Sequence, residues 1–148
     1  MKIVRVDAAN VVQAAEIHSR AWQESHRAFC EPDFVAQHTP ERQRAYFLQK
    51  MDAGSAVYML IDGRPAAVVS VAGSVIEDLY VLPEEQNRGL GTTLLRFACE
   101  KCAGTPRLWI LENNTRAARL YRRLGFSETG RRNSIAEGLD EIEFSQSD

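Results

Sequence analysis

The sequence lacks a hydrophobic run long enough to cross a membrane, since no stretch approaches the roughly 20 apolar residues that a spanning helix requires. Its first residues, 1–7, alternate polar and apolar side chains and contain no apolar segment of the kind found in a secretory signal peptide. These absences predict a protein without a membrane partner, and we expect it in the cytoplasm.

An excess of positive charge is also missing. Eighteen lysines and arginines stand against twenty acidic residues, which gives a net charge of −2. Proteins that bind nucleic acid neutralise phosphates with a basic surface, so this balance argues against nucleic acid as the main partner.

Cysteine is scarce and its spacing is uninformative. The three residues are Cys30, Cys99 and Cys102, an odd number without the pattern of a disulfide scaffold. Cys99 and Cys102 form a C-x-x-C inside a helical pattern, and no second pair of metal ligands follows. We therefore interpret them as buried thiols and expect no metal.

What is present is typical of one globular domain. The chain has 148 residues, of which 45% are hydrophobic and 26% charged. It contains no internal repeat and no linker, so we predict a single domain over residues 1–148.

Hydrophobic periodicity predicts an α/β fold, a mixed sheet of about seven strands flanked by about four helices. The predicted strands are 3–6, 56–61, 65–71, 75–82, 107–111, 126–131 and 141–144. The predicted helices are 11–22, 40–51, 91–102 and 115–124. Thr39 is the expected N-cap of the second helix, and His18 lies on the apolar stripe of the first, where we interpret it as a satisfied, partly buried histidine.

The stretch after the strand 75–82 carries a potential anion site. Gln86-Asn87-Arg88-Gly89-Leu90-Gly91 leads directly into a helix, whose first backbone N–H groups lack partners and whose dipole favours anions. Glycines let a phosphate approach the backbone closely, and Arg88 adds a cation. A phosphate or pyrophosphate ligand is predicted, although a plain structural turn has the same pattern. The P-loop lysine and the dinucleotide-binding glycine triplet are absent.

A second pattern follows about twenty residues later. Ala117, Leu120, Tyr121 and Leu124 share one helical face, Asn114 is placed to cap the helix, and Gly125 is placed to end it. Taken alone, this pattern is also typical of an ordinary core helix with a half-buried tyrosine.

Together the two stretches resemble the signatures of the GNAT superfamily of N-acetyltransferases. Gln86, Gly89 and Gly91 match [Q/R]-x-x-G-x-[G/A], and residues 114–126 match N-x-x-A-x-x-x-Y-x-x-x-G-F at every position. The resemblance covers most of residues 75–126 and implies a GNAT-like fold that uses acetyl-CoA as its acyl donor. The residues that it places around this cofactor are Leu79, Val81, Gln86, Asn87, Arg88, Gly89, Leu90, Gly91, Thr92, Asn114 and Ala117.

The resemblance further implies direct attack of an amine on the thioester, without an acyl-enzyme. Tyr121 would donate a proton to the leaving thiolate, and the Val81 N–H would stabilise the oxyanion. The general base is less defined. Glu77 is the first candidate because a strand period of two places it on the face of Leu79 and Val81, and Glu112 is the second; both residues are equally compatible with plain surface carboxylates.

The arginines of the second helix, Arg116, Arg119 and Arg123, are expected on a solvated face, with a contact to the 3′-phosphate of the cofactor as the alternative. Trp22, His26, Phe29 and Phe34 are candidates for an aromatic acceptor wall or for simple packing, and the expected loop 133–138 is the other candidate wall.

The main rival to an enzyme is a non-catalytic domain that binds acyl-CoA as a sensor or interaction module, although such a domain needs no tyrosine at position 121. The acceptor, whether a small molecule or a peptide amine, is not defined by the sequence. Homodimers are common among such folds, and a homodimer is an open expectation here.

Overall fold

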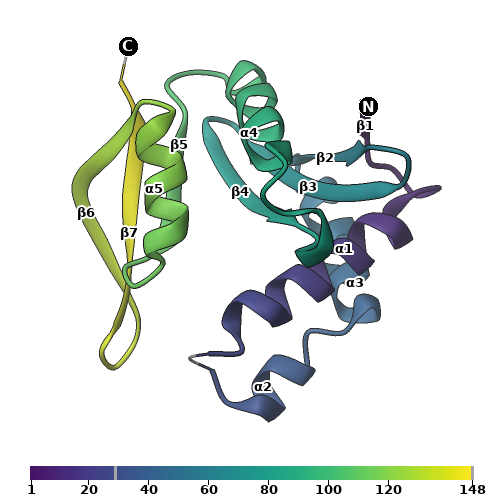
Figure 1. The fold of residues 1–148 in the computed structure, drawn as a ribbon, viewed down its shortest axis with the longest axis horizontal. Coiled ribbons are helices and arrows are strands. Elements are labelled where there is room, and N and C mark those ends of the chain that lie inside the picture. The colour runs from purple at the N-terminus through teal and green to yellow at the C-terminus, as the bar shows by residue number, and fades with distance from the viewer. Residues whose placement is uncertain (29, 148) are drawn as a thin grey trace.

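One seven-stranded sheet organises the protein (Figure 1). The computed structural model describes residues 1–28 and 30–147, so Phe29 lies outside the described residues. The strands are β1 (Lys2–Arg5), β2 (Ala56–Ile61), β3 (Pro65–Ala72), β4 (Val75–Val81), β5 (Arg107–Leu111), β6 (Phe126–Ala136) and β7 (Leu139–Gln146). The helices are α1 (Val11–His26), α2 (Pro32–Ala36), α3 (Pro40–Asp52), α4 (Leu90–Lys101), α5 (Thr115–Arg123) and the short 3-10 helix η1 (Pro83–Glu85).

The sheet has the order β1-β2-β3-β4-β5-β7-β6, and its centre is weakly joined. Only β4 and β5 run parallel, and they pair over just two positions, Val75 with Arg107 and Ile76 with Leu108. Beyond these pairs the two strands diverge, as Figure 1 shows. The sheet therefore consists of a β1–β4 half and a β5–β7–β6 half that separate toward the carboxyl end of β4.

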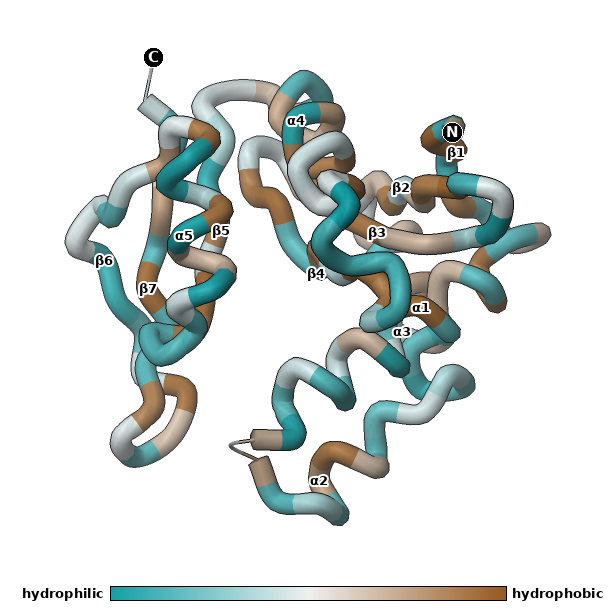
Figure 2. The backbone as a smooth tube through the Cα atoms, in the orientation of Figure 1, coloured by the Kyte–Doolittle hydropathy of each residue, from teal (hydrophilic) through white to brown (hydrophobic). Residues whose placement is uncertain are grey.

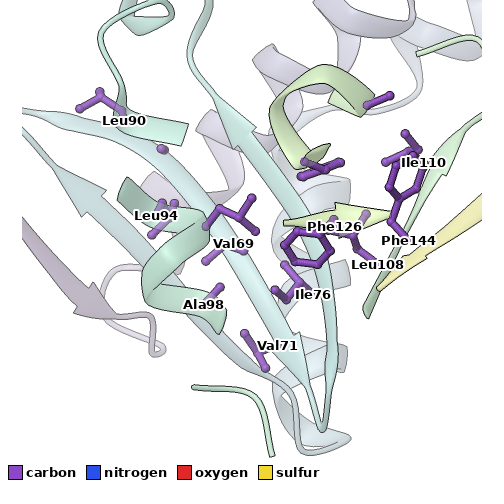
Figure 3. Close-up of a cluster of buried hydrophobic side chains, with 14 of the residues drawn as sticks. Val69, Val71, Ile76, Leu90, Leu94, Ala98, Leu108, Ile110, Phe126 and Phe144 are labelled. Carbon is purple, nitrogen blue, oxygen red and sulfur yellow. The ribbon is translucent and has the colours of Figure 1, made fainter. Parts of the chain in front are cut away.

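Helices cover both faces of the sheet, and alternate residues of β3 point to opposite sides. Val68 packs with Val11 of α1 and Phe47 of α3 on one face. Val69 belongs to the larger cluster on the other face, which Leu94 of α4 joins. Figure 3 shows how this cluster continues across both halves of the sheet. The labelled members are Val69, Val71, Ile76, Leu90, Leu94, Ala98, Leu108, Ile110, Phe126 and Phe144. No helix in the described part of the chain is long and apolar enough to span a membrane.

All the predicted strands and helices are present, and the mixed α/β fold is confirmed. The side chain of Thr39 caps α3 by accepting a hydrogen bond from the Arg42 amide at 3.2 Å. Local capping rules were sufficient here because the interaction involves only residues of the same turn.

Several features differ from the prediction. The first helix continues to His26, and the short α2 adds a fifth helix where no clear pattern was found. Strand β6 extends to Ala136 through the expected loop 133–138, because Asn133 pairs with Glu141 and Ala136 with Leu139 across the β6–β7 hairpin. Apart from Phe126, β6 is exposed along its length, so no apolar alternation marks it in the sequence. Helix α4 ends at Lys101, which leaves Cys102 partly buried at its C-cap.

Candidate functional site

A β-bulge at Asp78 opens the centre of the sheet. The register between β3 and β4 shifts between Val68 and Ser70, and Asp78 takes a left-handed conformation with φ of 56°. Aspartate tolerates this conformation better than most residues. Its carboxylate accepts hydrogen bonds from Lys50 Nζ at 2.6 Å, from the Tyr46 hydroxyl at 3.0 Å and from Ser70 Oγ at 2.8 Å.

His18 completes this group, which we call the Asp78 network (His18, Tyr46, Lys50, Ser70 and Asp78). Its Nε2 lies 3.0 Å from Asp78 Oδ1, and its Nδ1 lies 2.6 Å from Gln43 Nε2. Because a carboxylate only accepts, Nε2 carries the proton and Nδ1 accepts from the amide. His18 is 3% exposed, so the prediction of a buried histidine with satisfied nitrogens is confirmed.

The network fixes a negative charge beneath the bulge. Burial alone would raise the pKa of Asp78, but the hydrogen bond from His18 and the hydrogen bond and charge of Lys50 hold it well below its usual range. Burial alone would lower the pKa of Lys50, and the Asp78 carboxylate raises it overall. Asp78 is therefore ionised at neutral pH and too weakly basic to accept a proton.

The bulge also reverses the side-chain alternation along β4. Glu77 bonds to Lys50 Nζ at 3.0 Å, on the side of α3, whereas Leu79 and Val81 pack with the cluster under α4 and α5. The prediction that these three residues share one face is wrong, because the extra residue at Asp78 breaks the period of two.

A cavity of about 620 Å³, the first cavity, lies between the end of β4, the following turn and α5. Figure 2 shows the turn between β4 and α4 as a largely hydrophilic stretch. The lining contains every residue predicted to surround the cofactor except Arg88. These residues are Leu79, Val81, Gln86, Asn87, Gly89, Leu90, Gly91, Thr92, Asn114 and Ala117.

The backbone amides of Gly89, Leu90, Gly91 and Thr92 hydrogen-bond to no group in the described part of the chain. The first amide of α4 with an acceptor is that of Thr93, which donates to the Gly89 carbonyl at 3.0 Å. Gly89 itself has φ of 81°, a conformation that suits glycine. Four adjacent N–H groups at a helix N-terminus therefore face a cavity, an arrangement that binds phosphate groups.

Gly91 has no structural reason to be glycine. A Cβ built there would lie 3.5 Å from Val81 Cγ2, an ordinary contact, and its φ is not positive. Glycine destabilises a helix by about 0.5–1 kcal/mol relative to alanine. The residue leaves the backbone bare on the side of the first cavity, where a ligand would approach.

The positive charges of the first cavity come from α5. The side chain of Arg88 does not line the first cavity, because it pairs with Asp62 Oδ2 at 2.5 Å and with Glu85. The prediction that its guanidinium contacts the phosphate is therefore wrong. Arg116, Arg119 and Arg123 line the cavity instead, and Arg116 Nη2 donates to Asn87 Oδ1 at 3.1 Å. These arginines were expected on a solvated face; their side of α5 borders the cavity.

A second cavity of about 570 Å³ occupies the opening between β4 and β5. It shares part of its wall with the first cavity, so the two adjoin at the centre of the sheet. The shared residues are Ser25, His26, Leu79, Tyr80, Asn114, Arg116, Ala117 and Tyr121. Glu77 lines the second cavity, because the gap between the strands is reached from the α3 side as well.

Tyr121 stands at the junction of the cavities. It is 8% exposed, and no described residue hydrogen-bonds to its hydroxyl, whereas every fully enclosed polar side-chain atom in the described part has a partner. The hydroxyl therefore reaches the cavity. Burial raises the pKa of Tyr121 to about 12, so the group is protonated over the physiological range.

One backbone group and one side chain complete the junction. Leu82 N donates to the Ala66 carbonyl at 2.9 Å and Tyr80 pairs with Val68, so alternation along the strand directs the Val81 N–H toward the gap beside β5. Asn114 Oδ1 caps α5 by accepting from the Ala117 amide at 3.1 Å, which leaves its Nδ2 available to a ligand.

Of the other described candidate residues, His26 alone borders the junction. The ring of Trp22 stacks between those of His26 and His38, with centroid distances of 3.9 Å and 3.5 Å, and Phe34 makes an edge contact with it. These aromatic side chains therefore pack against one another. Of the described members, His26 also lines the cavities. Glu112 is bound to Arg132 Nη2 at 2.5 Å on the surface. No cluster of three metal-binding side chains occurs among residues 1–28 and 30–147.

The chain matches the model of the acetyltransferase (GNAT) family over residues 13–126. It is 32% identical over 99 residues to a streptothricin acetyltransferase of Streptomyces lavendulae, a match that covers 59% of this chain and 52% of that protein. The chain thus spans about half the length of this curated relative.

Two solved structures share the fold at low identity. The PaiA N-acetyltransferase of Thermoplasma acidophilum in complex with coenzyme A superposes with a TM-score of 0.72 and 15% identity, over 99% of this chain and 98% of that one. The putative acetyltransferase YncA of Salmonella typhimurium with its cofactor acetyl-CoA superposes with a TM-score of 0.72 and 21% identity, over 99% of this chain and 93% of that one.

Proposed function

This chain belongs to the acetyltransferase (GNAT) family, and on that premise we propose that it transfers an acetyl group from acetyl-CoA to a primary amine. The observation that carries the proposal is the row of four unpartnered amides at the mouth of α4, which faces a cavity that adjoins a second one at Tyr121. Donor and acceptor would thus meet at the tyrosine hydroxyl.

Coenzyme A fits the first cavity by its chemistry. Its pyrophosphate is proposed to lie on the amides of Gly89–Thr92, with the guanidinium groups of α5 nearby to balance the phosphate charges. Its pantetheine arm would follow the free edge of β4 past Leu79 and Val81 toward the gap, with Asn114 Nδ2 as a further donor.

The acceptor nitrogen attacks the thioester carbonyl carbon, and the Val81 N–H stabilises the resulting oxyanion. As the intermediate collapses, the C–S bond breaks, the coenzyme leaves as a thiolate and Tyr121 donates a proton or a hydrogen bond to its sulfur. With a pKa of about 12 for the tyrosine and about 8.5 for a thiol in water, full transfer runs uphill by ~5 kcal/mol.

Burial of the sulfur reduces this difference. In this protein, burial raises the pKa of the partly buried Cys99 thiol to about 11. A coenzyme thiolate in the enclosed junction is subject to the same desolvation, which raises the pKa of its thiol toward that of Tyr121. Tyr121 is therefore an effective partner for the leaving group only because both groups are removed from water.

Glu77 remains the proposed general base: the ammonium form of the acceptor passes one proton to this carboxylate, directly or through water, and the free amine that results attacks the thioester. Its side chain is 44% exposed and borders the second cavity, so a proton received there returns easily to solvent. Both glutamates pair with a cation, Glu77 with Lys50 and Glu112 with Arg132, but Glu112 lines neither cavity and is therefore the poorer candidate.

Calorimetric titration with acetyl-CoA, coenzyme A and ATP tests the donor, and a thiol-release screen over amines tests the reaction. We expect binding of both coenzyme forms and release of thiol with at least one amine class. Preference for ATP would refute the coenzyme site. Binding of acetyl-CoA without turnover of any amine would instead favour a non-catalytic acyl-CoA sensor.

A further inference from the structure

The two adjoining cavities differ in charge. The first is lined by three arginines, Arg116, Arg119 and Arg123, and by two glutamates, Glu24 and Glu85, of which Glu85 is already paired with Arg64 and Arg88. The second is lined by three carboxylates, those of Glu77, Asp78 and Glu141. Of the lysines and arginines in the described part, Arg116 alone lines the second cavity, and its guanidinium is bonded to Asn87 in the turn of the first.

The three carboxylates of the second cavity are not equally neutralised. Lys50 Nζ serves both Asp78, at 2.6 Å, and Glu77, at 3.0 Å. Glu141 accepts a hydrogen bond from Asn133 Nδ2 at 3.2 Å, and no cationic side chain of the described residues forms an ion pair with it. The second cavity therefore carries a net negative charge, with Glu141 as its most available carboxylate.

The wall between Glu141 and the junction is largely apolar. Leu111 pairs directly with Glu141 across β5 and β7, and Trp109 is the next residue but one along the same strand. Ile135 of β6 is 52% exposed, unusual for a large apolar side chain, and it borders this cavity. These side chains provide a largely apolar surface for methylene groups, although the guanidinium of Arg131 lies over the Trp109 ring, 5.7 Å from its centre.

From these observations we infer the class of the acceptor, an inference that rests on the proposed acetyl transfer. The acceptor bears a second ammonium group, separated from the reacting amine by an aliphatic spacer, and Glu141 binds this second ammonium. The unpartnered, buried hydroxyl of Tyr121 marks the reacting end of the cavity, and the carboxylate of Glu141 marks the binding end. Trp109 and Ile135 contact the spacer between them.

Matched pairs of amines test the inference. Thiol release is measured with putrescine against butylamine and with cadaverine against pentylamine, so that each pair differs by one ammonium group at similar length. In the pair whose spacer length fits the cavity better, we expect kcat/KM to be at least tenfold higher for the diamine than for the monoamine. The KM for this diamine should rise with salt concentration, because screening weakens the ion pair between its second ammonium and Glu141.

The variant Glu141→Gln keeps the acceptor atom for the Asn133 hydrogen bond and removes only the charge. It should raise KM for the diamine about tenfold, equivalent to about 1.4 kcal/mol, and leave the monoamine unchanged. Glu137→Gln, in the exposed β6–β7 turn, is the matched control and should leave KM unchanged for both the diamine and the monoamine.

The outcomes separate the two proposals. Equal turnover of diamines and monoamines, or equal effects of Glu141→Gln on both, would overturn the assignment of the acceptor while acetyl transfer stands. Thiol release with no amine at all, in a protein that binds acetyl-CoA, would overturn the proposed function itself.

Discussion

Replacing Tyr121 by phenylalanine removes one oxygen atom from the junction of the two cavities. Because no described residue hydrogen-bonds to this hydroxyl, the substitution breaks no intramolecular bond, and the free energy of unfolding should change by less than ~0.5 kcal/mol. The pyrophosphate turn and α5 keep their contacts, so acetyl-CoA should bind with nearly unchanged affinity.

Turnover should fall sharply in the same variant. A hydrogen bond to a charged group contributes about 1.5–3 kcal/mol, and the thiolate exists only as the C–S bond breaks. Loss of that bond corresponds to a decrease of about 10–100-fold in kcat. The assay is thiol release at saturating acetyl-CoA, with Kd measured in parallel by calorimetry.

Tyr58→Phe is the matched control, because Tyr58 lies on β2 against Phe97, away from both cavities, and should show wild-type kcat. The pH dependence adds a second test. Since burial raises the pKa of Tyr121 to about 12, the donor stays protonated and kcat should not decline through its ionisation below about pH 10. An unchanged kcat in Tyr121→Phe would refute the role of the hydroxyl.

Further predictions concern stability and the coenzyme. Asp78→Asn should destabilise the protein by about 1.5–3 kcal/mol in urea unfolding, since it removes the closer of the two carboxylates that pair with the partly buried Lys50. The depressed pKa of Asp78 gives stability that is complete above its unfolded value near 3.9 and is lost as pH falls toward the folded value, so the wild type should lose its advantage over the variant below about pH 4. Arg119→Gln should weaken binding of coenzyme A more than binding of dephospho-coenzyme A; equal losses would place the guanidinium away from the 3′-phosphate. Gly91→Ala should raise the free energy of unfolding by about 0.5–1 kcal/mol, and a decrease would mean that its Cβ is not tolerated.

Features that depend on neighbouring residues in the chain were predictable from the sequence. The turn after β4, the cap at Asn114 and the end of α5 before Gly125 all follow from local hydrogen bonding and backbone preference, and each lies where it was expected. The fold class followed from the order of these elements.

Features that depend on distant contacts were not predictable. The bulge at Asp78 exists because side chains from α1, α3 and β3 satisfy its carboxylate, and nothing within β4 signals it. For the same reason Glu77 was predicted on the face of Leu79 and Val81, whereas it lies on the opposite face of β4. Arg88 is adjacent to the anion-binding turn in sequence, yet it is drawn away by Asp62, a residue of the β2–β3 turn. Spacing alone could not reveal that competing partner.

The proposed function depends above all on the amides of Gly89–Thr92, which are proposed to bind the pyrophosphate of coenzyme A. Nitrogen-15 NMR titration of the labelled protein with coenzyme A, and separately with pantetheine, which lacks the pyrophosphate, measures this directly. The account predicts large, saturable shifts of these four amide signals with coenzyme A and small ones with pantetheine. Equal shifts with both ligands, or none with either, would contradict it.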